Sequence, residues 1–170
     1  MSLEIIIEDA RWNDVDLSGI ADRAVRQALE HLGLDPDRCE LSLLGCDDTE
    51  IAKLNAAHRD KPDATNVLSW PDTDLAATLP GHDPAPPQPD FTGEIALGDI
   101  AIAFDTCLRE AGAAGKPVGD HVAHLVVHGL LHLLGYDHIR DPDATLMEQI
   151  ETEILGRMGL DTPYCDTDGV

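Results

Sequence analysis

Three histidines in the second half of the chain carry the clearest chemical signal. His128 and His132 are four residues apart in an apolar stretch, so in a helix they project from one face. Gly135 follows, and glycine ends helices by adopting a left-handed conformation at no steric cost. A chain that reverses there can return His138 to the same point. Three protein ligands with a fourth position open are typical of a catalytic zinc site, so we predict one zinc ion per chain, bound by His128, His132 and His138.

The same segment, HGLLHLLGYDH over residues 128–138, matches the zinc-protease pattern HExxHxxGxxH at every ligand and glycine position. It departs from that pattern at Gly129, where the proteases carry the glutamate that acts as general base. Glycine cannot accept a proton from a metal-activated water. A metalloprotease-like hydrolase therefore stays an alternative that lacks its central chemical group.

Other polar residues adjoin the three histidines. His121 and His124 continue the same helical face, and we expect them to be structural polar groups near the helix start, with contact to a ligand or the substrate as the alternative. Asp137 precedes a proposed ligand and has two open interpretations. It either orients an imidazole or holds a proton, or it forms the turn.

Hydrophobic periodicity and turn residues predict the elements that position these side chains. The histidine helix begins near residue 119 or 120, and Ser18 is the expected N-cap of the first helix. Residues 71–92 contain six prolines and several aspartates, so we expect a flexible surface loop there. The pattern indicates an α+β fold, with a small mixed sheet packed by helices. Strands are expected at residues 3–8, 39–45, 67–70 and 94–104, and helices at 18–31, 47–57, 105–114, 119–134 and 141–158.

Composition fits one domain of 170 residues, of which 43% are hydrophobic. No stretch reaches the roughly 18–20 apolar residues that a membrane span needs. The N-terminus has no basic region followed by an apolar run, so we expect no signal peptide and a cytoplasmic location. The cysteines form no CxxC pair, and we expect reduced thiols at Cys39, Cys46, Cys107 and Cys165.

The formal net charge of −22, from 33 acidic and 11 basic residues, bears on the partners. Such a charge repels nucleic acid at long range and favours solubility. A cleft that gathers histidines, arginine and a divalent metal can still be locally positive. The charge also favours docking to basic proteins over binding to bare RNA.

Several segments together resemble one family. The 128–138 motif, with glycine in place of the protease glutamate, resembles the signature of the YbeY-type endoribonucleases, the bacterial ribosomal-RNA maturation factors. The segments LN, HR, TNVLS and LGDI at residues 54–55, 58–59, 65–69 and 97–100 resemble further blocks of that family in the same order. The resemblance covers roughly residues 47–164. Departures are His58, Ala64, Trp70 and a longer 71–92 loop, which affect the loop shape more than the histidine motif.

The resemblance implies a zinc-dependent endoribonuclease specific for single-stranded RNA. It would act in 3′-end processing of small-subunit ribosomal RNA and in ribosome quality control, with the small subunit and ribosomal proteins as partners and with no DNA or membrane partner. The resemblance also implies that His128, His132 and His138 are the metal ligands and that Arg59 is the essential arginine. A guanidinium suits this role because it donates two hydrogen bonds to phosphate in one plane. A non-catalytic ribosome-assembly factor with a structural zinc is the other alternative.

Overall fold

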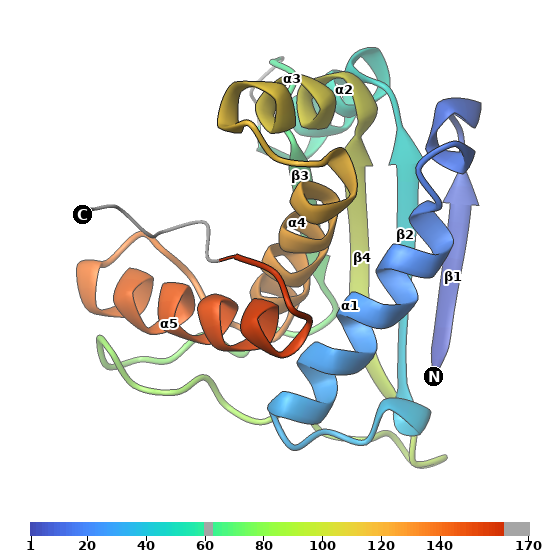
Figure 1. Ribbon diagram of the computed structural model, residues 1–170. Helices are drawn as coiled ribbons and strands as arrows, with labels where there is room; N and C mark the ends of the chain where they lie inside the picture. Colours follow the sequence, from blue (N-terminus) through green and yellow to red (C-terminus); the bar gives the residue numbers. More distant parts are fainter. Residues whose placement is uncertain (60–62, 162–170) are drawn as a thin grey trace.

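The computed structural model describes residues 1–59 and 63–161, with only the backbone described for residues 58–59. Within these residues four strands form one mixed sheet in the order β1-β2-β4-β3 (Figure 1). The strands are β1 (Ser2–Ile7), β2 (Cys39–Cys46), β3 (Val67–Pro71) and β4 (Ile95–Ala103). β1, β2 and β4 are parallel, whereas β3 is antiparallel to β4 at the edge. The bounds of all four strands lie within one residue of the predicted ones.

Five α-helices surround the sheet in the described part of the chain. They are α1 (Leu17–His31), α2 (Asp48–Arg59), α3 (Phe104–Ala114), α4 (Val118–Leu133) and α5 (Asp141–Arg157), with short 3-10 turns at Ala10–Asn13 and Pro36–Arg38. The predicted N-cap of α1 was wrong. Asp16 caps the helix through its Oδ1, which accepts the N–H of Gly19 at 3.3 Å, and Ser18 lies inside the first turn.

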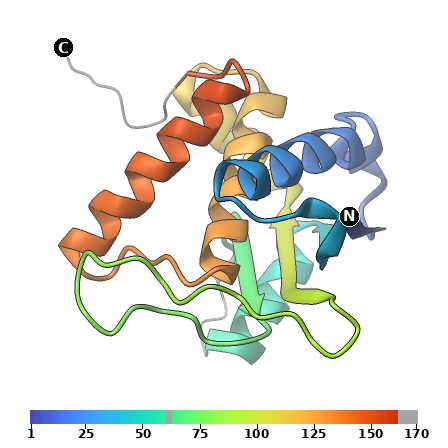
Figure 2. The same cartoon turned by 90° about the horizontal axis from the view of Figure 1, so that it is seen from below.

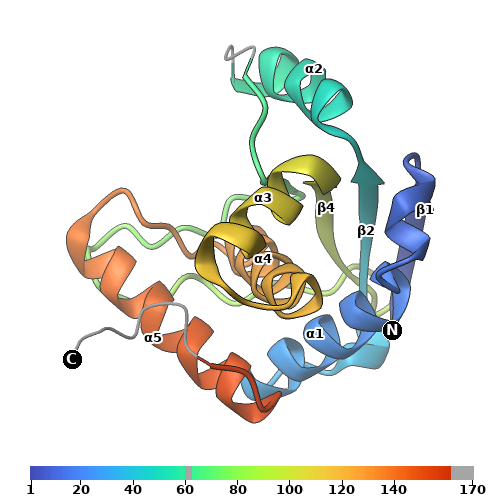
Figure 3. The ribbon, with the colours of Figure 1, turned by 45° about the horizontal axis from the view of Figure 1, so that its top comes forward.

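Helices α1 and α4 lie side by side on one face of the sheet (Figure 1). Their apolar faces and that of the sheet form the main core, which includes Val25, Leu29, Ile100, Val126 and Leu130. Helix α5 packs on α4 and on one end of α1. Helix α2 lies on the opposite face of the sheet, over a smaller apolar cluster (Figure 3). The α+β domain with a mixed sheet and a central histidine helix is confirmed.

The long connection from β3 to β4 has no helix or strand in residues 72–94. It runs beneath the molecule towards the start of α5 (Figure 2). Two parts of this connection lie against each other, since the N–H of Ala85 donates to the carbonyl of Leu75 at 2.9 Å. The irregular backbone matches the sequence prediction, and the flexibility of the loop stays a prediction.

Two further expectations concern the rest of the chain. No helix within residues 1–59 and 63–161 is long and apolar enough to cross a lipid bilayer. Cys39, Cys46 and Cys107 are buried free thiols. Burial raises the pKa of Cys46 to about 12, which keeps this sulfur protonated and unreactive. Cys165 lies outside the described residues.

Candidate metal centre

Helix α4 and the turn after it bring the three predicted ligands together. His128 and His132 lie on successive turns of α4, and the chain reverses beyond Leu133 so that His138 returns to them. The three histidines offer one ligand atom each, and these atoms all lie within 4.8 Å of one another. The rings of His128 and His138 stack with their centroids 5.4 Å apart. The three side chains therefore converge as expected, and metal binding by them stays a prediction.

The reversal depends on Gly135, whose φ of +99° lies in the region that favours glycine. Its N–H donates to the carbonyl of His132 at 3.1 Å, and the N–H of Tyr136 donates to the carbonyl of Leu131 at 3.0 Å. These bonds satisfy carbonyls at the end of α4. A Cβ at position 135 would lie only 2.7 Å from the carbonyl carbon of Leu75. Glycine is therefore needed both for the backbone angle and for the close approach of the 72–94 loop.

Hydrogen bonds set which ring nitrogens face the centre. The Nε2 atoms of His128 and His132 are 3.0 Å apart. Nδ1 of His132 lies 3.0 Å from the carbonyl oxygen of Tyr136, and Nδ1 of His128 lies 2.6 Å from Oε1 of Glu151. Carbonyl and carboxylate oxygens accept hydrogen bonds, so in the neutral rings both protons sit on Nδ1 and both lone pairs on Nε2. Two lone pairs that face each other at this distance form a donor set for one cation.

His132 is held in the form that binds metal. Burial, followed by the charges that His128 and His138 carry when protonated, lowers the pKa of His132 to about 4. Asp137 and the hydrogen bond to Tyr136 act in the opposite direction. The ring is therefore neutral at pH 7, and neutral imidazole is the metal-binding form.

The donor set fits zinc. Imidazole nitrogens bind zinc at about 2.0–2.1 Å, so two of them in a tetrahedral site lie about 3.4 Å apart. The separation of 3.0 Å between the Nε2 atoms of His128 and His132 is close to that value. Three imidazoles leave one position for a further group, as in catalytic zinc sites. Imidazole also suits nickel, copper and iron, so these ligands fit zinc without excluding the other metals.

Sequence reasoning missed one residue at this centre, Glu151 of α5. Its side chain is fully buried, and its two oxygens contact His128 and His124. A signal was present in the sequence, because Glu151 is a charged residue within the apolar stripe of α5. The buried apolar members of that stripe are Met147, Ile150, Ile154 and Leu155.

His124 and His121 differ in what they contact. His124 Nε2 lies 3.1 Å from Oε2 of Glu151, so this carboxylate links His124 to His128, whose ring also meets that of His124 edge to face at 6.2 Å between centroids. His121 Nε2 lies 2.9 Å from Oε1 of Glu110, one of whose oxygens also accepts from Asn66 at 3.1 Å. His121 is thus linked to α3 and to the start of β3. For His124, the alternative of contact to a metal ligand therefore has a geometric basis.

Asp137 contacts the backbone beside the third histidine. Its Oδ1 accepts the backbone N–H of His138 at 2.7 Å, which fixes the chain at the third histidine. Its side chain also lines the groove described below. Of its two interpretations, turn formation therefore has direct geometric support, and a role in orienting an imidazole or holding a proton stays a prediction.

Arg59 is the last residue of α2, and its side chain lies outside the described part of the chain. The amide of Asn55, one turn earlier, is almost fully buried and donates to the carbonyl of Asp63 at 2.9 Å. That bond joins α2 to the segment that leads into β3. The catalytic role of Arg59 stays a prediction.

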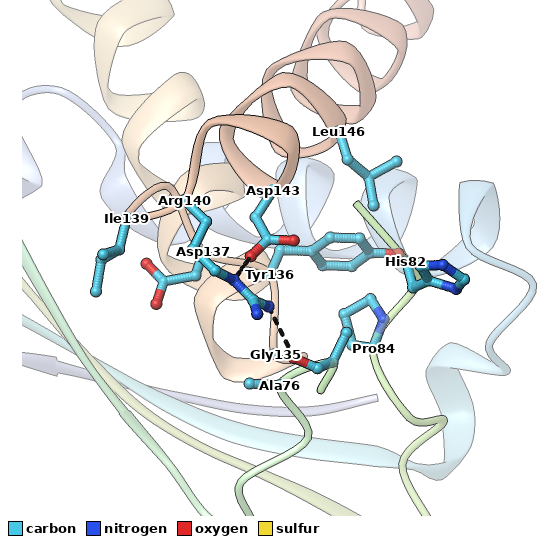
Figure 4. A pocket seen from close by; sticks show the side chains of 11 residues that line it. Ala76, His82, Pro84, Gly135, Tyr136, Asp137, Ile139, Arg140, Asp143 and Leu146 are labelled. Carbon is cyan, nitrogen blue, oxygen red and sulfur yellow. Dashed lines mark hydrogen bonds and ion pairs between the residues drawn. The ribbon is translucent and has the colours of Figure 1, made fainter. Parts of the chain in front are cut away.

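A groove of about 580 Å³ opens at the histidines. Residues 65–69, which include most of edge strand β3, form one wall, and residues 135–139 form another. A second hollow of about 300 Å³ adjoins it and shares Tyr136, Asp137 and Ile139 with it (Figure 4). Tyr136 extends across this hollow towards Pro84 and His82 of the long loop (Figure 4).

The loop that walls this hollow is fastened to the start of α5. Arg140 donates to the carbonyls of Ala77 at 2.8 Å and Thr78 at 3.0 Å. Asp143 pairs with Arg140 (Figure 4). Asp143 also accepts the N–H of Gly81 at 2.8 Å. These bonds join segments more than 60 residues apart. They hold the loop beside the groove.

Position 129 has little room for a side chain. A Cβ there would lie 3.1 Å from Cγ2 of Ile100 and 3.2 Å from Oγ of Ser69, both in the sheet. The hydroxyl of Ser69 also donates to the carbonyl of Gly129 at 3.1 Å. Helix α4 therefore rests closely on β3 and β4 at this point. A side chain at position 129 would require the side chains of Ile100 and Ser69 to shift by a few tenths of an ångström.

Comparison with known proteins agrees with the geometry. The family model described as Endoribonuclease YbeY matches residues 4–159. A protein of Ruegeria pomeroyi named Endoribonuclease YbeY is 65% identical over 164 residues, which cover 96% of this chain and 98% of that protein. One of the same name from Bartonella quintana is 40% identical over 98% of both chains.

A solved structure shares the fold. The solution structure of TM1509 from Thermotoga maritima aligns with a TM-score of 0.52 and 19% identity, over 98% of this chain and 97% of that one. At this identity the match concerns the fold alone. The near full-length family match and the identity to its named members decide the classification, and the chain belongs to the YbeY endoribonuclease family.

Proposed function

We propose that this protein is a zinc-dependent endoribonuclease that cuts single-stranded RNA in the cytoplasm. Its role would be 3′-end processing of small-subunit ribosomal RNA and ribosome quality control. The observation that supports it most is the pair of Nε2 atoms of His128 and His132, which face each other at 3.0 Å beside an open groove. Membership of a family named for endoribonuclease activity supports RNA as the substrate.

The residues of the centre suit phosphodiester cleavage better than peptide cleavage. Cleavage places extra negative charge on the phosphoryl oxygens, which calls for a cation and directed donors. A zinc ion held by His128, His132 and His138 would supply a Lewis acid for one such oxygen. Arg59 would donate two hydrogen bonds to the phosphate. Gly129 offers no carboxylate for the general base of a peptidase, and it packs closely against Ile100 and Ser69.

The groove suits a single strand. Unpaired bases can leave the stack and lie against aromatic rings, which paired bases cannot do. Tyr136 is partly buried in the wall shared by the groove and the adjoining hollow. Because Tyr136 lines both hollows, a base stacked on its ring would lie beside the groove that the histidines line. We assign Tyr136 this binding role as part of the proposed activity.

The net charge of −22 shapes how the substrate is reached. Free RNA is repelled at long range, whereas basic ribosomal proteins are attracted. We therefore propose that the chain docks on proteins of the small ribosomal subunit and cuts RNA presented there. The same charge favours the alternative of an assembly factor whose zinc is only structural, and that alternative predicts no cleavage.

One experiment can distinguish the endoribonuclease from the assembly factor. Zinc content and cleavage of single-stranded RNA are measured for the wild type, His132→Ala and Arg59→Glu, with Arg26→Glu on the exposed face of α1 as the charge-matched control. We expect about one zinc per chain and cleavage in the wild type and the control. His132→Ala should lose both, whereas Arg59→Glu should keep zinc and lose cleavage. Equal trace cleavage in all four proteins would contradict the enzyme proposal and favour the assembly factor.

A further inference from the structure

Helix α5 places a buried carboxylate between two turns of the histidine helix. Glu151 is 0% exposed. Its Oε1 lies 2.6 Å from Nδ1 of His128, and its Oε2 lies 3.1 Å from Nε2 of His124. His124 and His128 are four residues apart on α4, so one carboxylate spans one helical turn. Each oxygen of Glu151 therefore lies within hydrogen-bond distance of an imidazole nitrogen.

The burial of Glu151 makes its hydrogen bonds to the histidines important for stability. A carboxylate removed from water is costly unless it accepts strong hydrogen bonds, and bonds to an ionised acceptor are the strong kind. The contact requires the proton of neutral His128 on Nδ1, which leaves the Nε2 lone pair facing Nε2 of His132. The carboxylate thus selects the ring tautomer that a metal at the three histidines needs.

The packing of α5 keeps the carboxylate in place. Ile150 and Ile154, on either side of Glu151 in the sequence, are buried in the core that α5 shares with α4. Because these apolar side chains fix α5 against α4, Glu151 cannot turn outwards to water without unpacking the helix. The orientation of His128 is therefore set by the tertiary structure and not by α4 alone.

We propose that Glu151 is a positioning residue of the metal centre. It holds the His128 ring so that Nε2 points at the metal, and its negative charge strengthens His128 as a ligand. His124 acts one step further out, because its N–H steadies the second oxygen of Glu151. This inference rests on the proposed metal binding by His128, His132 and His138.

The same atoms allow a different interpretation, a second metal bound by His124, His128 and Glu151, whose ligand atoms also lie within 4.8 Å of one another. The distances argue against it. A metal between Nδ1 of His128 and Oε1 of Glu151 would hold them about 3 Å or more apart, since each ligand bond is about 2 Å long. The observed 2.6 Å is the length of a short hydrogen bond.

The test measures metal affinity separately from catalysis. Zinc dissociation constants are obtained by competition with a chromophoric chelator, and Co²⁺ is substituted to record its visible absorption bands. Glu151→Gln keeps the shape of the side chain and removes its charge. Glu153→Gln is the matched control, because Glu153 lies on the same helix with 45% of its side chain exposed. His124→Ala removes the outer partner of Glu151.

We expect Glu151→Gln to weaken zinc binding by about 10- to 100-fold and to shift the Co²⁺ bands, since loss of a residue that orients a ligand has effects of this size. His124→Ala should weaken binding less, and Glu153→Gln should match the wild type. Wild-type affinity and spectrum in Glu151→Gln would overturn the inference and leave the proposed function intact. Loss of metal in His124→Ala as complete as in His128→Ala would overturn it in favour of a ligand role for His124.

A second measurement needs no substitution and covers the case in which Glu151→Gln does not fold. Long-range ¹H–¹⁵N correlation spectra of the zinc-loaded wild type report the tautomer of each histidine. We expect His128 to carry its proton on Nδ1. A proton on Nε2 of His128 would overturn the inference. A wild type that binds neither zinc nor cobalt would contradict the proposed function itself, and the inference with it.

Discussion

His128 and His132 lie one turn apart on the same helix, yet they are oriented by acceptors of different origin. The acceptor of His132 is the carbonyl of Tyr136, four residues further along the chain. The acceptor of His128 is the side chain of Glu151, 23 residues away on another helix. One half of the centre is therefore built by a local turn and the other half by tertiary packing. The two halves should respond differently to substitution.

The largest expected loss of stability comes from the packing side. Ile154 is fully buried in α5, three residues from Glu151. Ile154→Ala should lower the free energy of unfolding by about 2–5 kcal/mol, since it removes buried methyl groups and leaves a cavity. The zinc affinity of the folded variant should fall less than about tenfold, because Glu151 itself is retained. Chemical denaturation and chelator competition measure the two effects.

Ile154→Val is a milder version of the same substitution. It should lower the free energy of unfolding by about 0.5–1.5 kcal/mol. A zinc affinity that falls in step with stability across both variants would show that packing sets the affinity directly. The separation between a local and a tertiary half would then be wrong.

The turn side should show the opposite pattern. Gly135→Ala should cost about 1–3 kcal/mol, because residue 135 has φ +99° and its Cβ would meet Leu75. Zinc affinity should fall more than tenfold, since the turn carries both the Tyr136 carbonyl and His138. The same two assays apply.

Gly33→Ala is the matched control for Gly135→Ala. Gly33 also has a positive φ, of +75°, but a Cβ there would meet nothing within 4 Å. It should cost about 1 kcal/mol through the backbone angle alone and leave zinc affinity unchanged. If Gly135→Ala also left zinc affinity unchanged, the turn would not determine the position of the ligands.

The smallest effect is expected where the long loop is fastened. Arg140→Ala removes the bonds to the carbonyls of Ala77 and Thr78 and should cost about 1 kcal/mol. Cleavage of residues 72–94 by a protease should become faster, while zinc affinity stays the same. Arg26→Ala, an exposed arginine of α1, is the control. Cleavage at the wild-type rate would mean that the loop is held by other contacts.

The sequence was sufficient to predict those features that depend on residues close together in the chain. The spacing of His128 and His132, followed by Gly135, specifies a helix face and its reversal within eleven residues. The strand bounds followed from β-branched runs and turn residues for the same reason. The N-cap was wrong because Asp16 and Ser18 are both good capping residues, and the choice depends on where the preceding turn leaves the chain.

Tertiary contacts limited the rest. That Glu151 faces α4 depends on how α5 packs, which its own periodicity does not specify, although a charge in an apolar stripe marks the residue. The partners of Arg140 are backbone carbonyls, so no side-chain pattern in the loop points to them. The tight fit of Gly129 against Ser69 and Ile100 likewise depends on the distance between helix and sheet.

That fit has an evolutionary consequence. Zinc proteases share the ligand spacing of this helix. Replacing Gly129 by glutamate would complete their sequence motif. The contacts of Gly129 with the sheet work against such an intermediate, because a Cβ at this position would require the side chains of Ile100 and Ser69 to shift by a few tenths of an ångström. The two motifs are therefore separated by a local change of packing against Ile100 and Ser69 as well as by the substitution itself.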